Sequence, residues 1–191
     1  MTEAETIARW ISPGARVLDL GCGDGALLKQ LWQTRQAPGY GIEIDDAKVL
    51  QCIKNDVNVL QMDLEDGLAA FADRSFDYVI LSETLQAIHR QEPLMKEMLR
   101  VGREAIVSFP NFGYLRARIQ IALAGHMPVS KELPYQWYDT PNVHHCTLVD
   151  FEALCAKLNF QVLERVVLTA GAPVSVLPNL LGSLAVYRVS A

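Results

Sequence analysis

Apolar and polar residues follow each other along the first 110 positions in a pattern that predicts strands and helices in turn. Short apolar runs predict buried strands, and the stretches between them carry turn residues or apolar positions at helical spacing. The strands are expected at 17–20, 40–44, 57–61, 76–81 and 104–109. Helices are expected to end at Ile11, to run from Ala26 to the Pro38–Gly39 break, and to cover 47–54 and 93–101. This alternation predicts a largely parallel sheet, whose ligand sites lie at the carboxyl ends of its strands.

The pattern changes after Pro110. A helix is expected over 112–124, followed by an irregular segment rich in aromatic residues and proline over 125–146. Thr147 and Asp150 form a capping-box signal for a further helix. Two alternating stretches, at 160–168 and 183–189, then predict strands. The link of roughly 15 residues between them is short for a crossover helix, so we expect an antiparallel pair.

Composition places these elements in one globular domain. The chain has 191 residues, of which 50% are hydrophobic and 20% charged, enough to bury a sizeable core. A net charge of -5 and a pI of about 5.3 argue against general nucleic-acid binding. No apolar run reaches the length of a membrane span, and the acidic N-terminus lacks the apolar core of a signal peptide. Cys22, Cys52, Cys146 and Cys155 show no paired spacing, so we expect free thiols in a reducing cytoplasm.

The first strand ends in a turn with three alternate glycines, Gly21, Gly23 and Gly25. Glycine tolerates positive φ and lets the backbone approach a ligand, while the helix that follows presents free N–H groups. A dinucleotide site would show G-x-G-x-x-G, so here the third glycine comes one residue early. Asp19 and Asp24 also place negative charge where a pyrophosphate would bind. The turn therefore favours a cationic or zwitterionic ligand, the alternative being a plain strand-to-helix connection.

This turn resembles motif I of the class I S-adenosylmethionine (SAM) methyltransferases. The resemblance implies a Rossmann-like fold with a mostly parallel seven-stranded sheet, an antiparallel last strand and helices on both faces. It also implies a site for SAM or S-adenosylhomocysteine. Glu43, at the end of the second strand, would accept hydrogen bonds from both ribose hydroxyls, although dinucleotide-binding folds use the same position. The expected cofactor-binding residues are Asp19, Gly21, Cys22, Gly23, Glu43, Ile44, Asp63, Leu64 and Ser82.

Asp63 and Ser82 follow the third and fourth strands. By the same resemblance, Asp63 would accept from the adenine amino group and the Leu64 N–H would meet a ring nitrogen. Asp63 is equally suited to cap a helix. Ser82 lies where the sulfonium is expected, beside Glu83, which is either a ligand group or a surface acid.

The sequence identifies no catalytic pair. The Asn/Asp-Pro-Pro-Tyr motif of amino-group methyltransferases is absent, and residues 82–85 stand in its place. His89 lies nearby as a possible base or a surface histidine. His144, His145 and Cys146 lack further ligands at metal-site spacing, so no metal is expected.

Two segments of the second half, 108–118 and 133–144, resemble the methionine biosynthesis protein MetW family. The resemblance extends from Ile11 to about Leu168. It implies a role in methionine biosynthesis alongside the homoserine O-acyltransferase MetX. We expect one domain over 1–191, with a SAM-binding half at 1–110 and, over 111–191, an aromatic insert, a helix and a β-hairpin.

Three hypotheses for the aromatic segment remain open. Tyr135, Trp137 and Tyr138 are residue types that anchor protein interfaces, which fits an accessory protein that binds SAM and a partner enzyme. The same segment would serve as a lid over the acceptor in an active methyltransferase acting on a small molecule. It would otherwise only cover the edge of the sheet.

Overall fold

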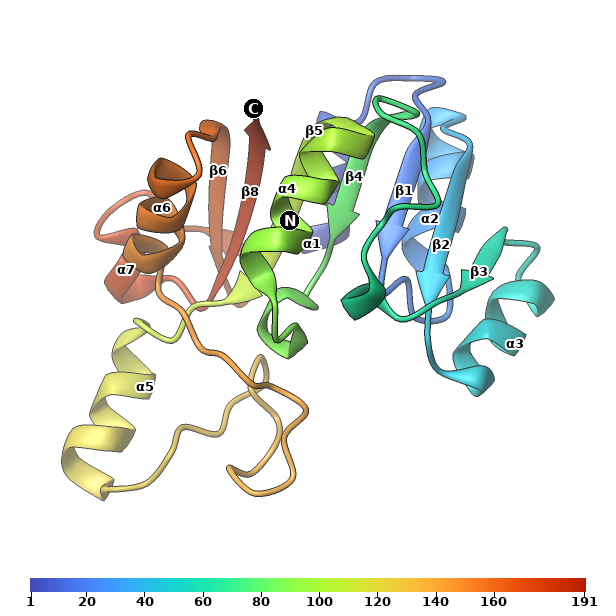
Figure 1. Ribbon diagram of the computed structural model, residues 1–191. Coiled ribbons are helices and arrows are strands. Elements are labelled where there is room, and N and C mark those ends of the chain that lie inside the picture. Colours follow the sequence, from blue (N-terminus) through green and yellow to red (C-terminus); the bar gives the residue numbers. More distant parts are fainter.

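The computed structural model describes residues 1–191 and contains one eight-stranded sheet with the order β3-β2-β1-β4-β5-β8-β6-β7 (Figure 1). The five strands from β3 to β5 pair in parallel. Strand β8 is antiparallel to both of its neighbours, β5 and β6. The strands are β1 Val17–Leu20, β2 Gly39–Glu43, β3 Val59–Gln61, β4 Phe76–Leu81, β5 Gly102–Pro110, β6 Gln161–Thr169, β7 Ala172–Pro173 and β8 Leu184–Ser190.

Helices cover both faces of the sheet, with α1 and α2 on one side and α4 and α6 on the other (Figure 1). Each face has its own apolar core. The helices are α1 Glu3–Trp10, α2 Ala26–Arg35, α3 Asp46–Lys54, α4 Gln91–Val101, α5 Leu115–Ile119, α6 Leu148–Lys157 and α7 Pro178–Leu181. Two 3-10 turns, η1 Leu64–Asp66 and η2 Leu85–Ala87, and a π-helical turn, η3 Gln120–Ala124, complete the set.

The predicted fold class is confirmed, including the parallel half and the antiparallel last strand. All four residues of β1 are buried, which explains why three of them are apolar and why Asp19 is the single polar residue of the strand. The expected number of seven strands is wrong by one. Strand β7 adds only Ala172 and Pro173, which pair with the end of β6. Two residues are too few to produce a recognisable alternating pattern.

The chain leaves the sheet after β5 and returns at α6, forming a projecting segment, residues 111–146, beyond the carboxyl ends of the strands (Figure 1). Asn111 fixes its base, because this side chain is only 2% exposed and fully bonded. Its Nδ2 donates to the carbonyls of Asn179 and Gly182 at 3.0 and 2.8 Å, and its Oδ1 accepts from the Gly113 N–H at 2.9 Å. The projecting segment therefore starts from a rigid point.

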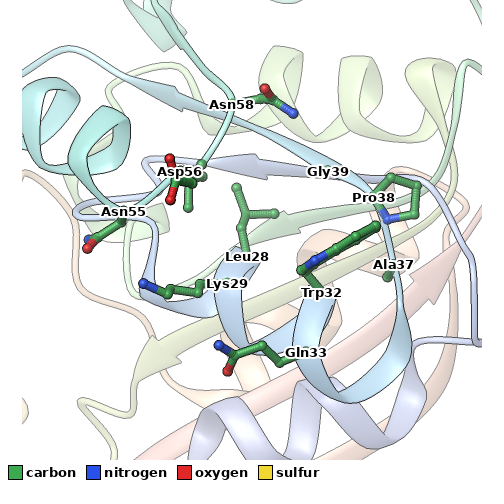
Figure 2. Close-up of a pocket in the computed structure, with 11 residues that line it drawn as sticks. Leu28, Lys29, Trp32, Gln33, Ala37, Pro38, Gly39, Asn55, Asp56 and Asn58 are labelled. Carbon is green, nitrogen blue, oxygen red and sulfur yellow. The ribbon is translucent and has the colours of Figure 1, made fainter.

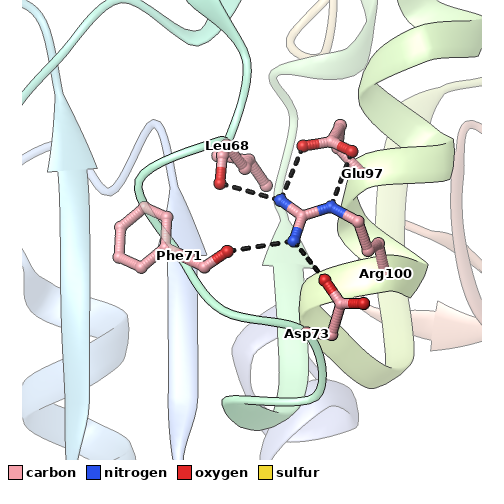
Figure 3. A network of polar contacts seen from close by, with 5 residues as sticks. All are labelled: Leu68, Phe71, Asp73, Glu97 and Arg100. Carbon is pink, nitrogen blue, oxygen red and sulfur yellow. Dashed lines mark hydrogen bonds and ion pairs between the residues drawn. The ribbon is translucent and has the colours of Figure 1, made fainter.

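Arg100 on α4 holds the loop between β3 and β4 in place (Figure 3). Its guanidinium donates to the carbonyls of Leu68 and Phe71, each at 3.0 Å. It also binds Glu97 in a bidentate pair at 2.8 Å and Asp73 at 2.6 Å. These bonds fix the loop that follows Asp63, one of the predicted site residues.

All four cysteines are free, as their spacing predicts. None of the helices combines the length and the apolar character that crossing a bilayer requires.

Candidate functional site

A cavity of about 630 Å³ lies at the carboxyl ends of β1, β2, β3 and β4, within the size range of small-molecule sites. Parallel strands place their carboxyl ends along one edge, so residues distant in sequence meet there. Residues of the projecting segment close the opposite side. From the sheet, the cavity is lined by Gly21, Glu43, Ile44, Asp63, Leu64 and Glu83, and from the projecting segment by Lys131, Glu132, Pro134, Tyr135, Pro141 and Asn142.

The predicted site residues divide into two groups. Gly21, Glu43, Ile44, Asp63 and Leu64 line the cavity. The other four, which are Asp19, Cys22, Gly23 and Ser82, are not part of the lining, although Gly23 donates its N–H to Glu43 in the lining.

The glycine turn approaches the cavity with bare backbone. Gly21 has a φ of +71°, and a Cβ there would lie 2.8 Å from the Thr84 hydroxyl oxygen, so a side chain would be both strained and crowded. The N–H groups of Gly21 and Cys22 donate to the Ile42 carbonyl at 2.8 and 3.0 Å, which ties the turn to β2. Asp24 accepts from the first N–H of α2, that of Ala26, at 3.1 Å. A side chain thus holds part of the helix N-terminus that a pyrophosphate would use.

Cys22 points away from the cavity. Its Sγ lies 3.8 Å from the Cys52 Sγ in the core between β2 and the helices, where a Cβ on Gly41 would collide with it. Burial, then the nearby Asp19 carboxyl, raises the pKa of the Cys22 thiol far above its usual range. Only the backbone of Cys22 can therefore contribute to a ligand site.

Glu43 is 6% exposed and is held by three backbone donors. The Gly23 N–H donates to Oε2 at 2.9 Å, and the Ile44 and Asp45 N–H groups donate to Oε1 at 2.9 and 3.0 Å. A carboxylate has about four lone-pair positions, so these bonds fix its orientation and leave limited accepting capacity for a ligand. Glu43 is thus a positioned acceptor in the cavity wall.

Asp63 takes the capping role that its sequence position allowed. Its Oδ1 accepts from the Glu65 N–H at 2.9 Å at the start of η1, which leaves Oδ2 without an intramolecular partner. The adjoining Leu64 also lines the cavity. A ligand edge that presents both a donor and an acceptor would match this pair.

Glu3 on α1 is a site residue that sequence reasoning missed. Its carboxylate accepts from the Ser82 hydroxyl at 2.6 Å and from the Ser108 hydroxyl, so the N-terminal helix is docked on the ends of β4 and β5. Burial, then the charges of Glu3 and Glu43, raises the pKa of Asp19 to about 7. No local sequence pattern could reveal the role of Glu3, because its bonding partners Ser82 and Ser108 lie 79 and 105 positions away in the sequence.

Glu83 occupies a strained turn at the cavity wall. It has a φ of +45°, unusual for a residue with a side chain, and its N–H donates to the Ser108 hydroxyl at 2.9 Å. Partial loss of water around the carboxyl, then Glu3 and Glu132, raises the pKa of Glu83 to about 7, while Lys131 opposes this shift. The sequence left Glu83 open between a ligand group and a surface acid, and the structure places it in the cavity wall.

Gln86 connects the cavity wall to the projecting segment. The N–H groups of Val143 and His144 donate to the Gln86 carbonyl at 2.8 and 3.0 Å. Within the segment so attached, Tyr135 lines the cavity, while Trp137 and Tyr138 are 73% and 70% exposed. One stretch of chain therefore forms a wall of the cavity and an outward aromatic surface.

The histidines form no metal centre. The His89 side chain is 70% exposed and lies 3.5 Å from Glu65. His145 stacks on Phe112, with ring centroids 4.7 Å apart. No group of three His, Cys, Asp or Glu side chains in the structure is arranged to hold a metal ion.

A second cavity, of about 590 Å³, lies beside α2, between this helix, the start of β2 and the link from α3 to β3 (Figure 2). Its walls include Leu28, Trp32, Pro38 and, at the rim, Lys29 and Asp56. Trp32 is 60% exposed. None of the predicted site residues lies in this cavity.

Comparison with known proteins identifies relatives over almost the whole chain. Residues 2–189 match the family model described as methionine biosynthesis protein MetW. A bifunctional methionine biosynthesis protein MetXA/MetW from Rhodopirellula baltica is 39% identical over 173 residues, which cover 86% of this chain. The match spans 28% of that longer relative.

Solved structures with the same fold include two methyltransferases. A SAM-dependent enzyme from Mesorhizobium loti superposes with a TM-score of 0.72 and 17% identity, covering 98% of both chains. One from Archaeoglobus fulgidus gives a TM-score of 0.71 and 14% identity, covering 99% of this chain and 95% of the other. At these identities the likeness establishes the Rossmann-like methyltransferase fold.

Proposed function

The chain belongs to the MetW family of methionine biosynthesis, and from that premise we propose that it binds SAM and acts as an accessory or regulatory partner of the homoserine O-acyltransferase MetX. The observation that carries the ligand assignment is Glu43, a buried carboxylate held in a cavity wall by three backbone N–H groups. A diol such as a ribose is a natural donor to such a group.

The residues present fit SAM in three respects. Gly21 leaves no room for a side chain where the methionine part would pass. Asp63, whose Oδ2 is free, and Leu64 line the same cavity as Glu43, which supports an adenine edge bound by this pair and a ribose bound by Glu43. Asp19 and Glu83 supply negative charge toward a cationic ligand.

Support for the partner comes from chain fusion and from surface chemistry. The relative from Rhodopirellula baltica carries MetXA and MetW in one polypeptide, which keeps the two at high effective concentration. On this chain, Trp137 and Tyr138 stand exposed with their rings 5.8 Å apart in an edge-to-face arrangement. Aromatic side chains of this kind anchor interfaces when a partner buries them.

Methyl transfer to a small molecule is the second candidate function, and the cavity lining supports it. When bound, SAM would supply an electrophilic methyl group. Tyr135 and Glu132 close the cavity from the projecting segment, as a lid over an acceptor would. Glu83, with a pKa of about 7, could accept a proton from an acceptor that arrives protonated.

Calorimetry with SAM and S-adenosylhomocysteine tests the ligand assignment. We expect the wild type to bind and Glu43→Ala to bind at least about 100-fold more weakly, since a charged hydrogen-bond acceptor is lost. Glu43→Gln keeps the size of the side chain and serves as the control for a folding defect in Glu43→Ala. Undetectable binding of both ligands to the folded wild type would refute the assignment.

Co-purification with the homoserine O-acyltransferase tests the partner assignment. We expect the two proteins to associate and Trp137→Ala to weaken the association by about 2 kcal/mol, the scale of an interface hot spot. Trp32→Ala serves as the matched control, because this side chain lies beside the start of β2 and the projecting segment lies beyond the carboxyl ends of the strands. An acyltransferase activity that does not change on addition of this protein would refute the accessory role.

A further inference from the structure

Three carboxyl groups lie close together near the turns that follow β1 and β4: Glu83, which lines the cavity, and Glu3 and Asp19, which do not. Glu3 is held there by the hydroxyls of Ser82 and Ser108. Its charge acts on both Asp19 and Glu83. Glu3 therefore acts on both the buried Asp19 and Glu83 in the cavity wall.

Positive charge is scarce around these groups. Asp19 is faced by Glu3 from α1 and by Glu43 from β2, both acidic. Glu83 is faced by Glu3, by Glu132 and by one cation, Lys131, from the projecting segment. This balance leaves the end of the cavity with an excess of negative charge.

Gln86 gives independent evidence for a ligand. It is 9% exposed and lines the cavity, and its Nε2 donates to the Glu83 carbonyl at 2.6 Å. Its Oε1 is buried and has no hydrogen-bond donor. An unsatisfied buried acceptor is costly, so this amide oxygen calls for a donor-bearing group.

We propose that Glu3, together with Asp19 and Glu83, makes this end of the cavity selective for positive charge, so that SAM is bound in preference to S-adenosylhomocysteine. This inference rests on the proposed function, because it concerns the same site. The two ligands differ by one methyl group and by the charge on sulfur. The attraction of the carboxylates for a sulfonium has no counterpart for a neutral thioether.

Proton release accompanies this selectivity. At neutral pH, Asp19 and Glu83 are partly protonated, since the pKa of each is about 7. A bound cation favours their charged forms, so their protons leave to the buffer as SAM binds. The affinity for SAM consequently rises between pH 6 and pH 8, and the affinity for S-adenosylhomocysteine rises less.

Calorimetry of both ligands at pH 6, 7 and 8, in buffers of different ionisation enthalpy, measures affinity and proton release together. We expect the wild type at pH 8 to bind SAM about tenfold more tightly than S-adenosylhomocysteine, the effect of one partly screened charge pair. The preference shrinks at pH 6. Net proton release is larger for SAM than for the thioether.

Glu3→Gln isolates the charge, because glutamine retains an acceptor for the two serine hydroxyls. We expect this variant to lose most of the tenfold preference while its affinity for S-adenosylhomocysteine changes less than about twofold. Glu5→Gln, on the same helix with a side chain 58% exposed, removes the same charge and should keep the preference. Thermal unfolding confirms that both variants are folded.

The outcomes separate the two proposals. Binding of SAM without preference over the thioether, or equal behaviour of Glu3→Gln and Glu5→Gln, overturns the inference and leaves the SAM site standing. Failure of the wild type to bind either ligand overturns both.

Discussion

The cavity at the carboxyl ends of the strands measures about 630 Å³ and the one beside α2 about 590 Å³, so their volumes hardly differ. The walls differ in how they are held. In the first, Glu43 is buried and bound by three N–H groups, and the wall loop is fixed by Arg100. In the second, Trp32, Lys29 and Asp56 are exposed side chains at a surface groove.

This difference shows what marks a ligand site. A polar group that is already oriented and desolvated costs little to reorganise when a ligand arrives, whereas a mobile exposed side chain must first be ordered. The cavity at the strand ends has such groups and the cavity beside α2 does not. The four predictions below test this contrast, from the largest expected effect to the smallest.

Removing the anchor of the projecting segment should be the most damaging change. Asn111→Ala loses three buried hydrogen bonds and leaves their partners unsatisfied, so we expect a loss of about 3 kcal/mol in the free energy of unfolding. Asn58→Ala, at the rim of the cavity beside α2, should cost less than about 0.5 kcal/mol. Denaturant unfolding measures both, and equal losses would contradict the contrast.

The buried acid in the glycine turn should make stability depend on pH. The pKa of Asp19 is raised to about 7 from an ordinary value near 3.8, so the folded state holds this proton more tightly than the unfolded state. The protonated Asp19 favours the folded state at low pH, and this contribution to stability is lost as the pH rises through 7. From Asp19 we expect a fall of about 2 kcal/mol in the free energy of unfolding between pH 5.5 and pH 8.

Two variants identify the source of this slope. Asp19→Asn should make it shallower, leaving the part that Glu83 contributes through its own raised pKa, and Asp56→Asn, at the rim of the other cavity, should leave it unchanged. Chemical denaturation at several pH values gives the slopes. A slope that is unchanged in Asp19→Asn would assign the whole effect to other groups.

The loop between β3 and β4, which carries one wall of the site, should loosen when the Arg100 guanidinium is removed. Arg100→Ala removes two bonds to backbone carbonyls and two ion pairs, for which we expect a loss of about 1.5 kcal/mol. Amide exchange should increase over residues 68–73. Lys29→Ala is the control, and comparable losses in the two variants would show that the loop needs no such support.

The smallest effect is expected at the cavity beside α2. Trp32→Ala should leave the affinity for SAM unchanged within about twofold, because this side chain lies on the far side of the glycine turn and is mostly exposed. Calorimetry under the conditions used for Glu43→Ala measures this. A tenfold loss of affinity would mean that the two cavities communicate.

Much of the fold was predictable because its signals are local. Strand β4 spans the predicted residues, since burial on both faces produces a continuous apolar run from Tyr78 to Leu81. Thr147 caps α6 through its own side chain, as its position indicated, and Asp45 caps α3 in the same way. The boundaries shifted where backbone geometry decided them, as at Asp56, whose φ of +57° delays the start of β3 to Val59.

The predictions for the site were incomplete for a different reason. The alternation of strands and helices predicts that the carboxyl ends of the parallel strands share one edge. Gly21, Glu43 and Asp63 could therefore be assigned to one site from the sequence. The direction of the Cys22 side chain depends on tertiary packing, because its Sγ occupies space that a side chain on Gly41 would fill. The docking of Glu3 is equally non-local, because it requires knowing where α1 lies against β4 and β5.

The stretch from Lys131 to Asn142 has one side in the cavity and the other in solvent, and this has a thermodynamic consequence. A ligand and a partner that press on opposite sides of one short segment share a coupling free energy. Linkage makes that coupling reciprocal: by whatever factor the ligand changes the affinity for the partner, the partner changes the affinity for the ligand. With the proposed ligand and partner, a cell would adjust the ligand occupancy of this protein through the abundance of the partner alone.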